Sequence, residues 1–338
     1  MSKPLLSICI PTFNRADILE RNLMRIVANP DFDEDVEIVI SDNCSTDKTE
    51  QVGRAFATKY SNIKYYRNDT NIRDKNFWLV LNEAHGKYRK LQNDYMSFAD
   101  DGLHVMKSYL QKHPQENIFF TGGFLFTCPE FSEVSCANIN EYLYYVSTFV
   151  TQISLFGIWE NDIPKIVDPM RDSSRMLVQV DWTFQLLTQK PHSVIVNKKV
   201  YQAVLAPSTK APSSVKYNWF SVHVKNYYDI MERYLSKNND NDEYNFINGK
   251  TLRKDKDNCL KHFKTELIFT YVYCPSHFKF KTEGTTEILR EYMSHCPRLY
   301  WYILQWPFLF LYIPRLYYKY EPTKLRRWIE RNFKRKRR

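Results

Sequence analysis

The chain has 338 residues, of which 43% are hydrophobic and 25% charged, so it is long enough for one or two globular domains and is neither disordered nor a bundle of membrane spans. Its eight glycines form no G-x-G-x-x-G or G-x-x-x-x-G-K-[ST] motif, which excludes a dinucleotide-binding fingerprint and a P-loop as written. The formal net charge of +10 is uneven, because residues 324–338 hold nine Lys or Arg against one Glu, and the nearly balanced remainder argues against a nucleic-acid-binding face.

Cysteine and histidine usage narrows the chemistry further. The seven cysteines are odd in number and form no C-x-x-C, so they indicate neither a disulfide framework nor a zinc ribbon. No two histidines have H-x-x-x-H or H-E-x-x-H spacing, which argues against a zinc site. The opening MSKPLLSICIP has an apolar run too short for a signal peptide, and we therefore expect a cytoplasmic protein with mostly buried thiols.

The first hundred residues alternate short apolar runs with helical patterns. We expect strands at residues 6–11, 37–41, 63–66 and 88–91. We expect a first helix after Asn14 that ends at about 27, a second after Asp47 that ends at about 60, and a third at 74–84. Asn14 and Asp47 each stand three positions before an acidic residue, and we expect each to cap the helix that follows it. Strand–helix alternation at this spacing predicts an α/β fold, with a parallel sheet and helices on both of its faces.

The rest of the body has weaker patterns. We expect strands at residues 118–120 and 194–200, a short helix at 182–189, and helices within 217–235 and 253–273. The segment STKAPSS at 208–214 marks a boundary. We therefore expect one domain at 1–207, made of a nucleotide-binding half at 1–98 and an acceptor half at 99–207, and then a helical region at 208–296 and a tail at 297–338.

The tail combines an aromatic run with a basic amphipathic pattern. Residues 299–313, LYWYILQWPFLFLYI, carry no charge, but they are fewer than the about 20 apolar residues that a membrane span needs. Farther along, the residues Leu325, Trp328, Ile329 and Phe333 form one helical stripe, and basic residues occupy the other faces. This arrangement predicts an amphipathic tail that lies on an anionic membrane surface. The alternative is a soluble helix that packs on the main domain.

Polar loops follow the first, second and fourth expected strands. They read PTFNR at 11–15, DNCSTD at 42–47, and Asn93-Asp94. Ligands bind at the carboxyl ends of the strands in such sheets, so these loops are expected to meet. There Asp42 can accept from a nucleobase N–H and Asp94 from a ribose hydroxyl. Each loop alone is also explained by ordinary turn and cap chemistry.

The segments LSICIPTFNRADILERNL and VEIVISDNCSTDKTEQV closely resemble the N-terminal halves of the family 2 glycosyltransferases with a GT-A fold. The continuation IKYYRNDTNIRDKNFWLVLNEAHGKYRKLQND also follows that pattern, so the resemblance covers residues 5–98. It implies a mixed nucleotide-binding sheet flanked by helices. It also implies an inverting transfer of a hexose or N-acetylhexosamine from a nucleotide sugar, UDP-linked first and dTDP-linked next. With the tail, it favours a lipid-linked or cell-surface polysaccharide acceptor at the inner face of a bacterial membrane.

The resemblance also assigns residues to roles. Those matching the first nucleotide-binding loop are Pro11, Thr12, Asn14 and Arg15. Asp42 matches the aspartate that contacts the base. Asn93 and Asp94 stand where an aspartate cluster touches the ribose and holds a divalent cation, Mn²⁺ or Mg²⁺, so Asp94 is the expected metal ligand.

The sequence departs from the family pattern directly after Asp94. Tyr95 and Met96 replace the frequent Asp-Asp, and neither side chain suits Mg²⁺ or Mn²⁺. Three interpretations remain open. Asp94 holds the metal with help from water and phosphate, the diphosphate is stabilised by cations instead, or the protein is catalytically weak or inactive. The cations named for the second interpretation are Arg73, Lys75 and Lys90.

A single displacement needs a base for the acceptor hydroxyl, and Asp181 is our candidate. It follows the apolar run MLVQV at the start of the expected helix, and Trp182 beside it is expected to pack on the sugar. The plain alternative is that Asp181 only caps the helix. Asp162 and Asp168 are further candidates for the base, and Trp159 is a candidate for the acceptor pocket or for the core.

Two functions of other classes remain as alternatives. The first is a non-catalytic, membrane-attached module that binds nucleotide sugars and has a degenerate metal motif. The second is a nucleic-acid-binding protein that uses the basic tail, with an affinity that falls steeply with salt.

Overall fold

The computed structural model describes residues 3–123, 132–204, 221–235, 244–245 and 251–252. The chain forms two compact units, residues 1–216 and 217–338. The predicted boundary at 208–214, the predicted helix at 253–273 and the tail at 297–338 lie outside the described residues.

A five-stranded sheet forms the centre of the first unit. In spatial order its strands are β3 (Ile63–Arg67), β2 (Val36–Asp42), β1 (Leu6–Thr12), β4 (Tyr88–Leu91) and β8 (Gly157–Trp159). The first four strands are parallel, whereas β8 pairs antiparallel with β4. The expected mixed α/β sheet is therefore confirmed, and each of the first four strands lies within two residues of its predicted position.

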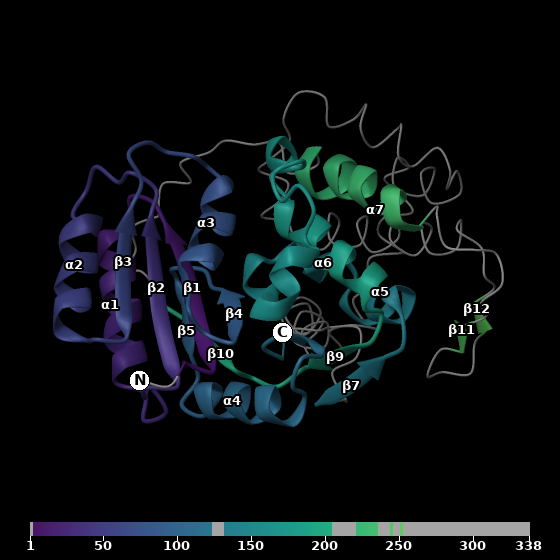
Figure 1. Ribbon diagram of the computed structural model, residues 1–338, viewed down its shortest axis with the longest axis horizontal. Helices are drawn as coiled ribbons and strands as arrows, with labels where there is room; N and C mark the ends of the chain where they lie inside the picture. Colours follow the sequence, from purple (N-terminus) through teal and green to yellow (C-terminus); the bar gives the residue numbers. More distant parts are fainter. Residues whose placement is uncertain (1–2, 124–131, 205–220, 236–243, 246–250, 253–338) are drawn as a thin grey trace, which may run out of the picture. The chain divides into compact units, whose positions relative to one another are not determined.

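Helices cover both faces of this sheet (Figure 1). They include α1 (Ala16–Val27), α2 (Thr49–Lys59) and α3 (Lys75–Glu83). Successive side chains of a strand point to opposite faces. Accordingly, Ile8 of β1 joins a buried cluster with Leu23 of α1, whereas the next residue, Cys9, joins a second cluster with Val80 of α3. The strands are thus buried on both faces, as expected for parallel strands.

The second half of this unit carries smaller sheets and further helices. The strand β5 (Met96–Phe98) pairs with β10 (Tyr201–Ala203), and the three-stranded sheet has the order β6 (Asn117–Phe120), β9 (Ser193–Val196) and β7 (Glu133–Cys136). The α-helices are α4 (Gly102–Lys112), α5 (Ile139–Val146) and α6 (Val178–Gln189). Short 3₁₀ turns are η1 (Ser147–Thr151), η2 (Ile153–Leu155), η3 (Glu160–Lys165) and η4 (Ser173–Arg175).

The described part of the second unit is short. A π-helical turn, η5 (Ser221–Asn226), leads into α7 (Tyr227–Leu235), in keeping with the helical pattern of the sequence. Two residues each form β11 (Tyr244–Asn245) and β12 (Thr251–Leu252), an antiparallel pair. Within the ranges that the structure describes, no helix has the length and apolar character needed to cross a membrane.

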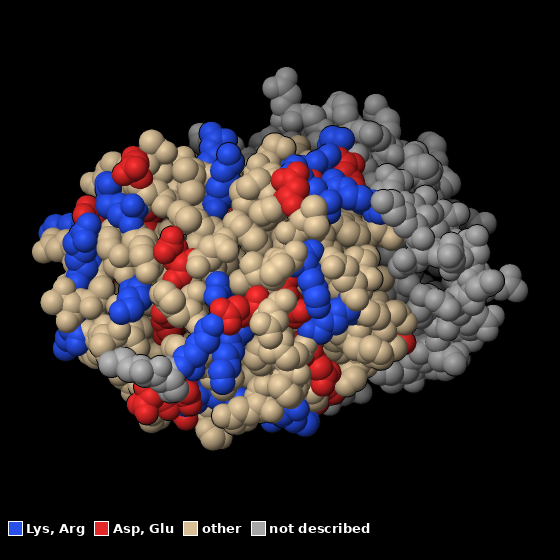
Figure 2. Space-filling view, in the orientation of Figure 1, with Lys and Arg blue, Asp and Glu red and all other residues tan. Residues whose placement is uncertain are grey.

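Charged side chains of both signs are interspersed on the face shown in Figure 2. Over the described residues of that face, no large area of one sign stands out. Such a mixed surface does not favour an extended nucleic-acid interface on that face.

Asp47 caps two helices, which differs from the predicted caps. Its carboxylate accepts from the backbone N–H of Ala16, at 3.0 Å, and of Thr49, at 2.9 Å, so it covers the first turns of both α1 and α2. Asn14 makes no cap on α1, and that prediction is wrong. Burial alone would raise the pKa of Asp47, but its hydrogen bonds to Thr49 and Ala16 lower that pKa overall.

The closest glycine contact in the sheet gives a stability prediction. Gly157 on β8 faces the buried ring of Tyr88, and a Cβ at this position would overlap Oη and Cζ of that ring. The ring is held by a 2.6 Å hydrogen bond from Tyr88 Oη to the Ile118 carbonyl. We expect Gly157→Ala to lower the free energy of unfolding by about 1–3 kcal/mol in denaturant titration. Gly157→Ala should cost less stability in a Tyr88→Phe background, where the hydroxyl is absent, than in the native chain. An equal cost in both backgrounds would contradict the overlap with the Tyr88 hydroxyl.

Candidate functional site

Three loops meet at the carboxyl ends of β1, β2 and β4. The strand register places Thr12 beside Asp42, and Cys9 beside Leu91 at the end of β4. Three residues after Leu91, Asp94 accepts a hydrogen bond from Thr12 Oγ1 at 3.0 Å. The predicted convergence of the first and third loops is therefore present as a direct contact.

The first and second loops are joined through Asn14. Its backbone N–H donates to Ser45 Oγ at 2.8 Å, and its side-chain oxygen accepts from the backbone N–H of Thr46 at 2.7 Å. Asn14 has a positive φ of 52°, which asparagine tolerates better than most residues. The polar side chain thus orders the second loop instead of capping α1.

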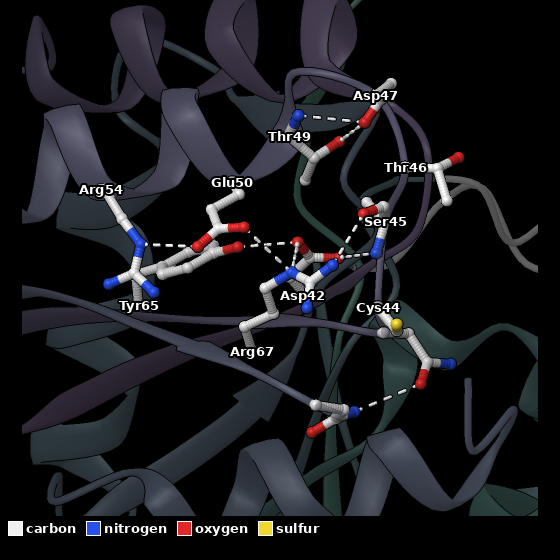
Figure 3. A network of polar contacts seen from close by, with 12 residues as sticks. Asp42, Cys44, Ser45, Thr46, Asp47, Thr49, Glu50, Arg54, Tyr65 and Arg67 are labelled. Carbon is white, nitrogen blue, oxygen red and sulfur yellow. Dashed lines mark hydrogen bonds and ion pairs between the residues drawn. The ribbon is translucent and has the colours of Figure 1, made fainter. Parts of the chain in front are cut away.

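Asp42 lies at the centre of a polar network in the second loop (Figure 3). Its side chain has no exposed surface and accepts from Ser45 N at 2.9 Å and from Tyr65 Oη at 2.7 Å. Arg67 Nε lies 3.9 Å from the same carboxylate and 3.1 Å from Glu50. Burial of the ring, together with the hydrogen bond to Asp42, raises the pKa of Tyr65. A nucleobase that contacts Asp42 therefore requires Tyr65 or Arg67 to shift.

Asn43 fastens the segment before α3 to the second loop. Its side-chain amide donates to Asn71 Oδ1 at 3.0 Å, and its side-chain oxygen accepts from the backbone N–H of Ile72 at 2.8 Å. No individual role for Asn43, Tyr65 or Arg67 was predicted from the sequence. The spacing of Tyr65 and Arg67, two apart on one strand beside β2, was the available signal.

Backbone conformations that side chains rarely adopt gather in these loops. Among the described residues, the six non-glycine positions with positive φ include Asn14, Cys44 and Arg73, with φ of 52°, 65° and 54°. Residues held in this region cost about 1–3 kcal/mol each and cluster at functional sites. Three of the six lie in three loops that hydrogen bonds connect, which supports the assignment of these loops as a site.

Asp94 is 5% exposed and is held on three sides. Besides the bond from Thr12, it accepts from Arg15 Nη1 at 3.1 Å, and its backbone carbonyl accepts from the Asn22 side chain at 2.9 Å. Burial raises the pKa of Asp94, although the charge of Arg15 and the bond from Thr12 oppose that rise. Next to it, the Asn93 N–H donates to Ser154 Oγ at 3.0 Å, so the backbone of this segment is fixed as well.

The side chains around Asp94 do not fit a divalent cation. Mg²⁺ and Mn²⁺ prefer several hard oxygen ligands, whereas Asp94 is a single carboxylate whose two oxygens already accept from Thr12 and Arg15. Gln92 is fully buried and adds no ligand on the solvent side. Within the described ranges, no group of three or more His, Cys, Asp or Glu could hold a metal. The metal role of Asp94 stays a prediction, and this donor set speaks against it.

The three alternative cations differ in access. Arg73 and Lys75 are exposed near the site, but Lys90 has no exposed surface. Its Nζ donates to the carbonyls of Ser154 and Leu91 and lies 5.1 Å from the centre of the Tyr201 ring. As folded, Lys90 does not reach a ligand, and its suggested contact with a diphosphate is wrong.

Burial of Lys90 gives a pH prediction. Desolvation lowers the pKa of this amine to about 7, whereas an unfolded chain keeps it near its ordinary value of 10.5. Between these values the unfolded state binds the extra proton, so the free energy of unfolding rises with pH. We expect the difference in unfolding free energy between the native chain and Lys90→Met to shift by up to about 1.4 kcal/mol per pH unit between pH 7 and 9. A difference that stays constant over this range would contradict the buried, neutral amine.

Asp181 lies in the first turn of α6 and is 1% exposed. Arg171 contacts both carboxylate oxygens, with Nε at 2.8 Å and Nη2 at 2.5 Å, and Gln185 donates to one of them at 2.7 Å. The helix begins at Val178, four residues before its predicted start, and its residues before Asp181 are all buried. The base role of Asp181 stays a prediction, and three described hydrogen bonds already engage its carboxylate.

Three other candidate residues of this region are held in buried contacts within the fold. Asp162 is buried between Lys165 and Lys190, with both Nζ atoms 2.6 Å from its oxygens. Trp159 belongs to the core and donates to the Glu116 carbonyl at 2.6 Å. Trp182 has no exposed surface and packs on Trp78 and Phe156, so the expected contact with a sugar is wrong.

Sequence comparison identifies the kind of domain that contains these loops. Residues 7–121 match the family described as Glycosyl transferase family 2. The abequosyltransferase RfbV of Salmonella typhimurium is 39% identical over 108 residues, which are 31% of this chain and 32% of that protein. The GalNAc(5)-diNAcBac-PP-undecaprenol beta-1,3-glucosyltransferase of Campylobacter jejuni is 33% identical over 107 residues, which are 32% of each protein. The similarity thus spans about a third of each relative.

Structural comparison extends over more of the chain. TarS 1–349 of S. aureus, solved in complex with UDP-GlcNAc, has a TM-score of 0.56 at 16% identity, over 93% of this chain and 86% of that one. At this identity the likeness concerns the fold alone. It supports the GT-A fold expected from the sequence.

Proposed function

Because residues 7–121 match the family 2 glycosyltransferases and the fold is like that of TarS, we propose that this chain transfers a sugar from a nucleotide donor to an acceptor hydroxyl. The observation that carries the proposal is the joining of the three polar loops at the carboxyl ends of β1, β2 and β4. The residues proposed to bind the nucleotide are Pro11, Thr12, Asn14, Arg15, Asp42, Asn93 and Asp94. Asp42 takes the base, and Asp94 faces the ribose and the start of the diphosphate.

The reaction is a single displacement that inverts the anomeric carbon. The acceptor oxygen forms a bond to C1 of the sugar while the bond from C1 to the diphosphate oxygen breaks. The hydroxyl proton passes to Asp181, and the electron pair of the broken bond leaves on the nucleoside diphosphate. Asp181 is a suitable base only after its ion pair with Arg171 opens, so acceptor binding is expected to displace Arg171.

The donor and the acceptor are proposed by class. A UDP-sugar carrying a hexose or N-acetylhexosamine is the first choice and a dTDP-sugar the second, and the UDP-GlcNAc complex of TarS supports the first. A lipid-linked or cell-surface polysaccharide acceptor is supported by the name of the Campylobacter relative, which specifies a PP-undecaprenol-linked substrate. We further propose that residues 299–338 hold the enzyme on the cytoplasmic face of the membrane.

One observation favours a second function. The expected metal ligand Asp94 and the candidate base Asp181 are each paired with an arginine, and Tyr95 and Met96 replace the carboxylates frequent at the metal position. A non-catalytic, membrane-attached module that binds nucleotide sugars would have these features.

A donor panel separates the two functions. The full chain is incubated with UDP-, dTDP- and GDP-sugars, with and without a polyprenyl-diphosphate-linked acceptor, and the released nucleotide is quantified by chromatography. We expect the acceptor to increase release from one donor. Binding of a nucleotide without release from any donor would support the non-catalytic module, and absence of both would contradict the site itself.

A further inference from the structure

The contact between Arg15 and Asp94 occupies the place where the family resemblance puts a metal. Arg15 Nη1 lies 3.1 Å from Asp94 Oδ1, and Thr12 donates to Oδ2 at 3.0 Å. The two side chains differ in access, since that of Asp94 is 7% exposed and that of Arg15 is 30% exposed. The carboxylate is therefore enclosed by its own chain, while the guanidinium keeps an open side.

Arg15 is held at both ends. Its backbone N–H, just before the start of α1, donates to Oγ1 of Thr49, the first residue of α2, at 3.2 Å. Its guanidinium carbon lies 5.7 Å from the centre of the Tyr95 ring, a cation–π contact. Tyr95 is one of the two residues that replace the usual aspartates. Tyr95 thus lacks the carboxylate that would bind a metal, and its ring instead contacts the guanidinium of Arg15.

Most N–H donors of the Arg15 guanidinium make no described hydrogen bond. It carries five N–H groups in a fixed plane, and the described contacts use Nη1 alone. This fork matches the oxygens of a phosphate and binds them in pairs.

Two other positive groups of this region are less suited to a diphosphate. The first N–H of α1, that of Ala16, is already bonded to the Asp47 carboxylate, which also places negative charge at that helix end. Lys90 is buried on backbone carbonyls.

We propose that Arg15 neutralises the donor diphosphate in place of a divalent cation, and that Asp94 and Tyr95 hold it in position to do so. This inference rests on the proposed function and refines it. Arg15 bridges Asp94 and the diphosphate, and it stabilises the charge that develops on the leaving oxygen as the bond to C1 breaks.

Calorimetric titration with UDP tests the inference without requiring turnover. The full chain is titrated in EDTA and again in Mn²⁺, with dTDP and GDP as further probes. We expect the dissociation constant of the preferred nucleotide to agree within about threefold between the two conditions, because the loss of a charged contact would change it by tenfold or more.

Variants assign the effect to Arg15. Arg15→Gln should weaken nucleotide binding at least about tenfold in both buffers, and Arg15→Lys should restore part of the affinity, because Lys supplies the charge without the fork. Tyr95→Leu, which keeps both charged groups, should weaken binding about two- to fivefold. Arg25→Gln, which changes an exposed residue in the last turn of α1, is the matched control and should bind as the native chain does. Melting temperatures establish that each variant is folded.

The outcomes separate this inference from the proposed function. Binding that EDTA abolishes and Mn²⁺ restores, or unchanged binding by folded Arg15→Gln and Tyr95→Leu, would overturn the role of Arg15 and leave the transferase in place. No binding of any nucleotide in either buffer would overturn the proposed function, and the inference with it.

Discussion

Asp181→Asn is expected to lower the rate of sugar transfer by about 10²–10⁴-fold, the usual contribution of a positioned general base. Asparagine has the shape of aspartate but does not accept the acceptor proton. The described contacts of Asp181 are with Arg171 and Gln185 and not with the three nucleotide-binding loops. The affinity for the nucleotide should therefore stay within about threefold of the native value, well under the change that loss of a direct charged contact causes. Released nucleotide in the presence of acceptor gives the rate, and calorimetry gives the affinity.

Two controls accompany this variant. Asp168→Asn alters another acidic candidate, and it should keep near-native transfer. The pair with Arg171 is bidentate and Asp181 is buried, so Asp181→Asn can also destabilise the unit, and its melting temperature must be compared with that of the native chain. A folded Asp181→Asn with near-native turnover would remove Asp181 as the base.

Asp42→Asn is expected to weaken nucleotide binding by about 10- to 100-fold, which corresponds to about 1.4–2.7 kcal/mol. The carboxylate accepts from Ser45 N and Tyr65 Oη and lies beside Arg67. Asparagine keeps one acceptor oxygen, places an N–H₂ group against these donors and leaves Arg67 without its buried anion. The second loop should therefore lose its shape as well as its contact with the base.

Glu50→Gln is the matched control for Asp42→Asn. Glu50 also contacts Arg67, at 3.1 Å, but it belongs to the exposed rim of the same network. Exposed ion pairs contribute about 0–1 kcal/mol, so nucleotide affinity should change less than about fivefold. Equal losses for Asp42→Asn and Glu50→Gln would show that general charge, and not the buried acceptor, supports binding.

The sequence predicted those features of the fold that depend on local periodicity. Apolar runs and helical spacing placed the four parallel strands and α1 to α3 within two residues, because both faces of this sheet are buried and the pattern is strong. The start of α6 was less accurate. Its first residues, VQVD, alternate apolar and polar side chains, and all of them are buried, so the pattern there carries no period that marks a helix.

The candidate site was predicted as a set of loops and not as a network. The contact between Asp94 and Thr12 follows from the order and register of the strands. The alternation of strands and helices in the sequence suggests that order. The contact of Arg15 with Tyr95, the bond from Tyr65 to Asp42 and the pair of Asp181 with Arg171 depend on side-chain directions across the fold. No local pattern encodes these contacts. The same limit explains why Asp47, and not Asn14, caps α1, because the cap comes from a loop 31 residues away in sequence.

A crystal structure of the full chain with UDP or a UDP-sugar is the decisive test of the nucleotide site. We expect the nucleotide to lie against the loops at residues 11–15, 42–47 and 93–94, with the base near Asp42 and a phosphate oxygen on the guanidinium of Arg15. A nucleotide bound elsewhere on the chain, or none at saturating concentration, would contradict the assignment of this site.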